Sequence, residues 1–210
     1  FRIQKTLHDR ERTRAGIARS PVLPRVWIPQ FANDTVTMRG DISANGAGIF
    51  ARNTGSATVT VDTIGDILSG GDSIYANSSQ GVIDVDSVGN LTAGGYGIYA
   101  VNLGSNAVTV NSTGDIDAVN RGIYAQSATG TVTIVTSGTV ASDSDAIFAQ
   151  SDGSATVSVT SVGDLYAGTN GDGIYAFSAT GIVTVNSDGD ITADSDGIFA
   201  RSLGNSTVSI

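Results

Sequence analysis

The feature that most constrains this chain is a motif that recurs seven times between Gly40 and Ile210. With small variations, each copy opens with Gly-Asp-Ile, passes through a Gly-Ile-aromatic-Ala centre and closes with alternating Val and Thr. A period of 24 to 26 residues is typical of a solenoid, in which each copy forms one coil and stacks on the next. We number these coils 1 to 7 by their opening glycines: Gly40, Gly65, Gly89, Gly114, Gly138, Gly163 and Gly189.

Each coil contains three stretches with the two-residue alternation of β-strands, exemplified by Ile42-Ser43-Ala44, Ile49-Phe50-Ala51 and Val59-Thr60-Val61. One coil cannot bury its apolar side chains, but stacked coils would enclose them and pair each strand with its copies about 4.8 Å away. We therefore predict an all-β fold: a parallel β-helix with three short strands per coil and about seven coils. We expect it to be right-handed, because crossover connections between parallel strands strongly prefer that hand.

A second period is superimposed on the first. The turn before the third stretch is one residue longer in odd coils, as at Gly55-Ser56-Ala57, than in even coils, as at Gln80-Gly81. The repeating unit is therefore a pair of coils of about 49 residues. Residues 168–172 of coil 6 include two additional residues, which should form a bulging loop. The last copy stops in mid-coil, so we expect a longer parent protein or a subunit that covers this end.

Charge divides the chain into two domains. Residues 1–39 carry eight basic and three acidic side chains, a net charge of +5. Residues 40–210, the β-helix of two-coil units, carry three basic and seventeen acidic side chains, a net charge of −14, which disfavours nucleic acid as a partner. The basic segment also holds the apolar cluster Trp27, Ile28 and Phe31. Three interpretations stay open: a cap on the first coil, a docking arm that grips a neighbouring copy, or a remnant of a signal or added sequence.

One aromatic residue per coil forms the main candidate site. Strand alternation places it opposite the buried Ile and Ala, which favours an outward-facing column that binds a partner or a glycan. Alternatively, a corner reverses the alternation and the rings fill the interior. The column consists of Phe50, Tyr75, Tyr99, Tyr124, Phe148, Tyr175 and Phe199.

A second column is acidic, and it permits two interpretations. The carboxylates either accept backbone N–H bonds at a corner or bind calcium, although the calcium-binding nonapeptide of β-rolls is absent. We expect no metal site and no other cofactor; the chain has no Cys and one His, His8. The column runs Asp41, Asp66, Asn90, Asp115, Thr139, Asp164 and Asp190.

The third stretch presents a hydroxyl-rich outer face, including Thr58 and Thr60 in coil 1 and Thr109 in coil 3. A flat array of threonines can bind ice, but Asp84 and Asp86 interrupt this one. Ice binding is therefore an alternative to adhesion rather than the leading hypothesis.

Catalysis has little support. β-Helix enzymes build a groove from long, unequal loops, whereas these loops have three to five residues and are nearly uniform. No phosphate loop, zinc spacing or nucleophile–base pair occurs in the sequence. We expect a protein that is not an enzyme; a polysaccharide-degrading β-helix enzyme is the alternative.

The repeat Gly-Asp-Ile-Asp-Ala-Val-Asn-Arg-Gly-Ile-Tyr-Ala at 114–125, followed by Gly-Thr-Val-Thr-Ile, resembles the passenger domains of Gram-negative autotransporters. The resemblance covers residues 40–210, and β-helical adhesins of two-partner secretion and phage fibres have similar coils. It implies a secreted or surface-displayed adhesin or fibre, exported across the outer membrane by a part not in this chain. It further implies partners such as a host-cell ligand, or other copies stacked end to end or side by side. No family catalytic triad maps onto this sequence.

Overall fold

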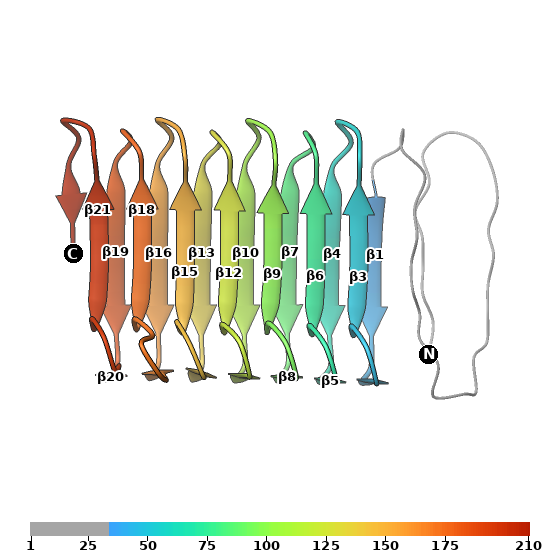
Figure 1. Ribbon diagram of the computed structural model, residues 1–210. Helices are drawn as coiled ribbons and strands as arrows, with labels where there is room; N and C mark the ends of the chain where they lie inside the picture. Colours follow the sequence, from blue (N-terminus) through green and yellow to red (C-terminus); the bar gives the residue numbers. More distant parts are fainter. Residues whose placement is uncertain (1–33) are drawn as a thin grey trace.

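The computed structural model describes residues 34–210, which form one continuous stack of β-strands (Figure 1). Every strand pairs in parallel with its counterpart in the next coil, and this part of the chain contains no helix, hence none that could span a membrane. The strands build three sheets that run the length of the stack. The predicted all-β parallel β-helix with three strands per coil and about seven coils is confirmed.

We name the three sheets by their strands, in the order in which a coil visits them. The short sheet contains β2 (Ile42–Ala44), β5 (Ile67–Ser69), β8 (Leu91–Ala93), β11 (Ile116–Ala118), β14 (Val140–Ser142), β17 (Leu165–Ala167) and β20 (Ile191–Thr192). The aromatic sheet contains β3 (Ile49–Asn53), β6 (Ile74–Ser78), β9 (Ile98–Asn102), β12 (Ile123–Ser127), β15 (Ile147–Ser151), β18 (Ile174–Ser178) and β21 (Ile198–Ser202). The long sheet contains β1 (Asp34–Arg39), β4 (Val59–Ile64), β7 (Ile83–Val88), β10 (Val108–Thr113), β13 (Val132–Ser137), β16 (Val157–Val162), β19 (Val183–Asp188) and β22 (Val208–Ser209).

Within residues 34–210, the β-helix already includes the six residues before the first repeat glycine. Strand β1 pairs with β4, with Val36 opposite Val61 and Met38 opposite Thr63. The sequence boundary at residue 39/40 therefore lies within the stack. Thr35-Val36-Thr37-Met38 also alternates, but the sequence did not identify it as a strand of the repeat. The reason is that a bulky Met38 occupies the position where other coils have Ser or Thr.

The core is a set of aliphatic columns inside the three sheets. In β12, for example, Ile123 and Ala125 are fully buried while Tyr124 between them is not. Each column continues in register through every coil, so Ile123 lies between Ile98 and Ile147. Shifting a strand by one residue would turn its aliphatic side chains outward, which strongly opposes any slip.

The opening glycine of each coil makes the corner between the long and short sheets. All seven have positive φ, from +104° to +139°. At Gly114 a Cβ atom would lie 2.5 Å from the carbonyl oxygen of Gly89. Backbone conformation and close stacking together therefore require glycine at this corner.

Buried Asn or Ser side chains hold the turn between the aromatic and long sheets. In the longer turns of coils 1 and 3, Asn53 and Asn102 accept the N–H two residues later at 2.6 Å. In the shorter turns of even coils, Ser78 Oγ and its counterparts accept the N–H three residues later, at 2.7 to 2.9 Å. Within residues 34–210 these side chains bond to the backbone of the turns and not to their copies in neighbouring coils.

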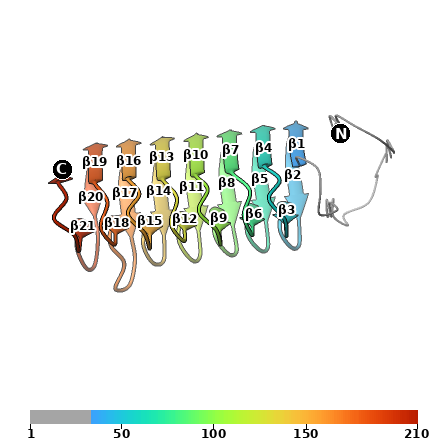
Figure 2. The same cartoon turned by 90° about the horizontal axis from the view of Figure 1, so that it is seen from above.

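Coil 6 departs from the others in the connection between β17 and β18, which extends further than its neighbours (Figure 2). Asn170 in this connection has a φ of +56° and is the one non-glycine residue with positive φ within 34–210. Its N–H donates to Asp194 of coil 7 at 3.0 Å. The predicted bulge at residues 168–172 is thus present.

Candidate binding face

The seven aromatic side chains form a continuous stack on the outer face of the aromatic sheet. Neighbouring ring centroids are 4.6 to 5.3 Å apart, and neighbouring planes differ by 1° to 13°. Each ring is partly exposed, whereas the Ile before it and the Ala after it face the core. The rings therefore follow the outward orientation that strand alternation favoured, from Phe50 through Tyr75, Tyr99, Tyr124, Phe148 and Tyr175 to Phe199.

Stacking limits what this column can bind. Each of the five inner rings has a neighbour on both faces, so no inner ring offers a whole open face. A sugar that packs flat on an aromatic residue needs such a face. A thinner planar group that approaches from the side needs less room. The geometry therefore favours small planar groups and polypeptide side chains over flat-lying sugar rings.

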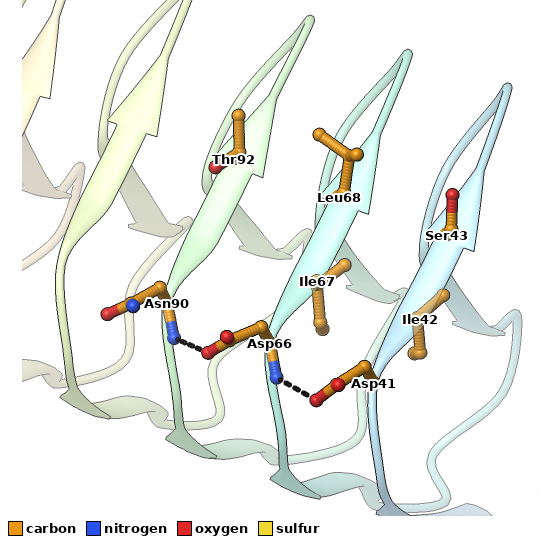
Figure 3. A pocket seen from close by; sticks show the side chains of 8 residues that line it. All are labelled: Asp41, Ile42, Ser43, Asp66, Ile67, Leu68, Asn90 and Thr92. Atoms are coloured by element: carbon orange, nitrogen blue, oxygen red, sulfur yellow. Dashed lines mark hydrogen bonds between the residues drawn. The ribbon is translucent and has the colours of Figure 1, made fainter.

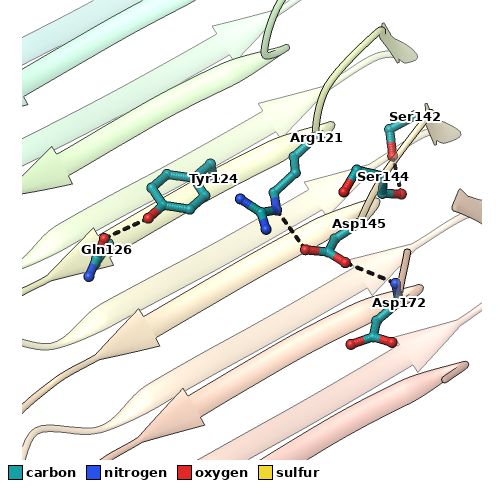
Figure 4. A network of polar contacts seen from close by, with 7 residues as sticks. All are labelled: Arg121, Tyr124, Gln126, Ser142, Ser144, Asp145 and Asp172. Carbon is teal, nitrogen blue, oxygen red and sulfur yellow. Dashed lines mark hydrogen bonds and ion pairs between the residues drawn. The ribbon is translucent and has the colours of Figure 1, made fainter. Parts of the chain in front are cut away.

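Two side chains from the connections between the short and aromatic sheets, Tyr96 and Arg121, lie against the rings near the middle of the column. Tyr96 packs on Tyr99 and Tyr124, with centroids 5.3 and 5.7 Å apart. The Arg121 guanidinium carbon lies 5.3 Å from the Tyr124 centroid and 4.6 Å from that of Phe148. Arg121 Nε donates to Asp145 Oδ2 at 2.6 Å (Figure 4).

Sequence reasoning missed this network of Tyr96, Arg121 and Asp145. Its members had one shared signal: each lies three residues before the aromatic residue of its coil. The position is occupied in turn by Ala47, Asp72, Tyr96, Arg121, Asp145, Asp172 and Asp196. We call this set the flanking column.

Three tyrosine hydroxyls of the stack, those of Tyr99, Tyr124 and Tyr175, have raised pKa values. Burial raises the pKa of Tyr99 to about 12, and the neighbouring Tyr75 adds to the effect. Burial also raises the pKa of Tyr124, against the lowering effect of Arg121, and that of Tyr175, where Asp172 contributes further. The Tyr124 hydroxyl donates to Gln126 Oε1 at 2.6 Å. These three tyrosines therefore present neutral hydroxyl groups as hydrogen-bonding partners at physiological pH.

The acidic column follows the corner between the long and short sheets and is tied to backbone. Asp41 Oδ1 accepts the N–H of Asp66 at 3.0 Å, and Asp66 Oδ1 accepts the N–H of Asn90 at 2.8 Å (Figure 3). The same bond recurs from Asp115 to Asn90, from Thr139 to Asp115 and from Asp190 to Asp164. Of the two interpretations, the structure has carboxylates that accept backbone hydrogen bonds. Within residues 34–210, no three His, Cys, Asp or Glu side chains form a group that could hold a metal ion.

An open depression lies along this corner, lined by Asp41, Asp66, Asn90 and Leu68 among others (Figure 3). Leu68 is 56% exposed and faces solvent from the outer side of the short sheet. The carboxylates here already bond to the next coil through one oxygen. The depression is thus a by-product of the corner geometry.

The outer face of the long sheet is hydroxyl-rich, and Thr60 and Thr109 lie on it as predicted. Thr60 lies opposite Asp84 and Asp62 opposite Asp86, whereas Thr58 lies in the turn before β4. Asp62 also pairs with Arg39 at 3.2 Å, and Asn111 donates to Asp86 at 2.8 Å. Charged and amide groups thus interrupt the threonine array over coils 1 to 3. The cluster Trp27, Ile28 and Phe31, and with it the choice between cap and docking arm, lies outside the described residues.

Sheet topology and the repeated outer columns define this molecule as a parallel β-solenoid. Comparison with protein-family models, curated proteins and solved structures finds no match to the chain.

Proposed function

We propose that the chain is a non-catalytic structural and adhesive β-helix, secreted or displayed on the cell surface of a Gram-negative bacterium. The observation that carries this proposal is the unbroken aromatic stack on an outer face of a rigid rod. A row of partly exposed rings is the kind of surface that proteins use to bind partners. The resemblance to autotransporter passengers supports export across the outer membrane by a part outside this chain.

Protein partners fit the aromatic stack better than glycans do. The inner rings cover one another, whereas Tyr hydroxyls, Gln126 and Arg121 offer polar contacts along the stack. A host-cell protein or another copy of the chain is therefore the favoured ligand, and a surface glycan is the second candidate. Self-association, side by side or end to end, remains part of the proposal as a route to filaments.

Two other functions make different predictions. A polysaccharide-degrading enzyme needs a groove formed by unequal loops, and coil 6 supplies the main inequality among the described coils. A calcium- or ice-binding solenoid needs open carboxylates or an uninterrupted threonine array. The backbone-bonded acidic column and Asp84 and Asp86 on the long sheet weigh against these functions.

Electron microscopy and a binding assay test the proposal. The purified chain should form rods or filaments, and beads coated with it should adhere to cells or matrix proteins. Replacing Tyr75 and Tyr99 with Ser should weaken adhesion, whereas Thr109→Ala with Thr133→Ala, on the long sheet, should leave it unchanged. Circular dichroism would establish that both variants fold. Equal adhesion by both variants would exclude the aromatic stack as the adhesive surface. Release of reducing sugar ends from polysaccharides would favour the alternative that the chain is a polysaccharide-degrading enzyme.

A further inference from the structure

Arg121 shows how a guanidinium group binds to the aromatic sheet. It lies beside two successive rings, those of Tyr124 and Phe148, and its Nε donates to the carboxylate that flanks the second ring. Asp145, that carboxylate, uses its other oxygen to accept the N–H of Asp172 at 2.9 Å. One oxygen therefore holds the stack together while the other binds arginine.

Coils 6 and 7 repeat this arrangement without an arginine. Asp172 Oδ1 accepts the N–H of Asp196 at 2.9 Å, as Asp145 does for Asp172, and its Oδ2 has no hydrogen-bond partner within residues 34–210. In coil 5 the flanking column carries Asp145 where coil 4 carries Arg121, so no guanidinium of this part of the chain reaches Asp172. Phe148, Tyr175 and Phe199 continue the ring stack beside Asp172 and Asp196, with centroids 4.6 and 5.0 Å apart.

The charge around these coils favours a cation. Burial is the main cause of the raised pKa of Tyr175; Asp172, Asp145 and Asp152 raise that pKa further, and Arg201 lowers it. Residues 34–210 contain eighteen Asp side chains and four basic side chains. Ion pairs form at Asp62 and at Asp145. Arginine suits the site better than lysine, because a flat guanidinium both stacks on rings and donates to a carboxylate.

The chain itself contains a segment with matching chemistry. Residues 1–33 carry seven basic and two acidic side chains, and Arg10, Arg12 and Arg14 alternate along the sequence. Fully extended, 33 residues reach roughly 110 Å. Coil 6 is about 25 Å from coil 1 along the stack, so the segment can reach it on its own molecule or on a neighbour.

We propose that the outer face of the aromatic sheet over coils 5 to 7 binds arginine side chains of residues 1–33, through Asp172 and Asp196 and the rings beside them. This inference concerns contacts between parts of the chain and does not depend on the adhesive function.

Trypsin tests the proposal on the full chain, because it must engage the arginine side chains that the face would hold. Cleavage after Arg10, Arg12 and Arg14 should be about two- to fivefold faster in Asp172→Asn/Asp196→Asn than in the unaltered chain at low salt. Asparagine at 172 keeps an oxygen for the N–H of Asp196, so the turn is preserved. The matched control Asp117→Asn/Asp188→Asn makes the same charge change on the short and long sheets and should leave the rate unchanged.

Each further result decides the question. Salt at 0.5 M, for which the Debye length is about 4 Å, should raise the rate in the unaltered chain to that of the Asp172→Asn/Asp196→Asn variant. If protection from trypsin grows with protein concentration, the segment binds to a neighbouring copy. If protection does not depend on concentration, the segment binds to its own molecule. Equal cleavage rates in the unaltered chain and Asp172→Asn/Asp196→Asn would overturn the proposal. An equal acceleration in the control variant would also overturn it, because attraction would then be unspecific.

Discussion

Inward-facing and outward-facing residues alternate along each strand. From coil to coil, the residue type varies little at the inward-facing positions of Ile134 and its counterparts and much more at the outward-facing positions beside them. On β13, Ile134 faces the core and continues a column of Val and Ile from coil to coil. Thr133, its neighbour, faces outward in a column that also contains Thr109 and Ser158 and, further along, Asp84. The pairing is identical on both sides, so backbone hydrogen bonding does not account for the difference.

Packing accounts for it. An inner side chain is surrounded by the coils above and below and by the other two sheets, so its volume and polarity are fixed. An outer side chain touches its copies and water. The inner columns therefore define the fold, and the outer columns are where functions such as partner binding can differ between coils. The aromatic stack is the exception on the outside, since its rings continue through all seven coils.

The largest expected difference between the two sides comes from adjacent residues of β13. Ile134→Ala leaves a cavity in the core and should destabilise the protein by about 2–5 kcal/mol. Thr133→Ala, one residue away, should change stability by no more than about 0.5 kcal/mol. Urea denaturation of both variants measures the difference. Similar midpoints would mean that the interior is not packed as described.

The corner glycines extend the comparison to the backbone. Gly114 and Gly40 both have positive φ, but a Cβ atom at Gly114 would overlap the Gly89 carbonyl, whereas Gly40 has nothing within 4 Å. Gly40→Ala should cost about 1–3 kcal/mol from strain alone. Gly114→Ala should cost more than Gly40→Ala, as measured by thermal unfolding, because the stack must also move apart. Equal costs would contradict the close approach of coils at this corner.

On the outside, Asp115 bonds to the next coil, whereas the Asp117 carboxylate has no hydrogen-bond partner within residues 34–210. Both are exposed, but Asp115 accepts the N–H of Thr139 at 2.8 Å. Asp115→Ala should cost about 1 kcal/mol and Asp117→Ala close to nothing, as judged from denaturation midpoints. Asp115→Asn should behave like the unaltered chain, because Asn90 plays this part in coil 3. If added calcium raised the melting temperature, and Asp115→Asn abolished that shift, the calcium alternative would gain support.

A gain of stability is expected at the turn of coil 5. Ser151 occupies the place of Asn53 and Asn102 in a longer turn, and its buried Oγ has no partner within the described residues. Ser151→Asn should restore the bond to the N–H two residues later and raise stability by about 0.5–1.5 kcal/mol. Ser127→Asn is the control, because the shorter turn of coil 4 already uses serine. A destabilised Ser151→Asn variant would mean that the coil 5 turn lacks room for the amide.

The last prediction concerns the dependence of stability on pH and the outer stack. The neutral form of Tyr99 is favoured in the folded chain, since burial raises its pKa from 10.0 to about 12. Between these values the unfolded chain releases a proton that the folded chain keeps, so stability should fall as pH rises from about 10 to 12 and then level off. Tyr99→Phe should flatten this dependence. Ultraviolet titration should show tyrosine ionisation delayed relative to free tyrosine, and an ordinary titration curve would contradict the burial of the stack.

Much of the fold could be read from the period. Strand stretches, aliphatic columns, corner glycines and the enlarged loop of coil 6 were predictable, because each constraint recurs in the sequence or breaks a recurrence. Strand β1 was not predictable, because Met38 occupies a position where the other coils have Ser or Thr. Thr58 was wrongly assigned to the outer face of the long sheet, because the Thr-Val alternation of coil 1 begins one residue before β4 does.

The candidate site was only partly predictable. The seven aromatic positions follow from the repeat, but the contacts of Tyr96, Arg121 and Asp145 arise in connections whose sequences differ in every coil. An inner column of hydroxyls was also missed: Ser112, Thr136, Ser161 and Ser187 on the long sheet lack hydrogen-bond partners within residues 34–210. Because these residues are polar, the sequence suggests that they face solvent. The alternation of the strand instead places their side chains inside.

The sequence by itself determined a coil, its three strands and the side chains inside it, because a spacing copied seven times leaves one way to bury the aliphatic residues. Only the tertiary structure decided which surface residues meet. That depends on the exact rise and rotation from one coil to the next, which set the overlap of the rings, the oxygen that each aspartate offers to the next coil and the reach of Arg121 across two rings.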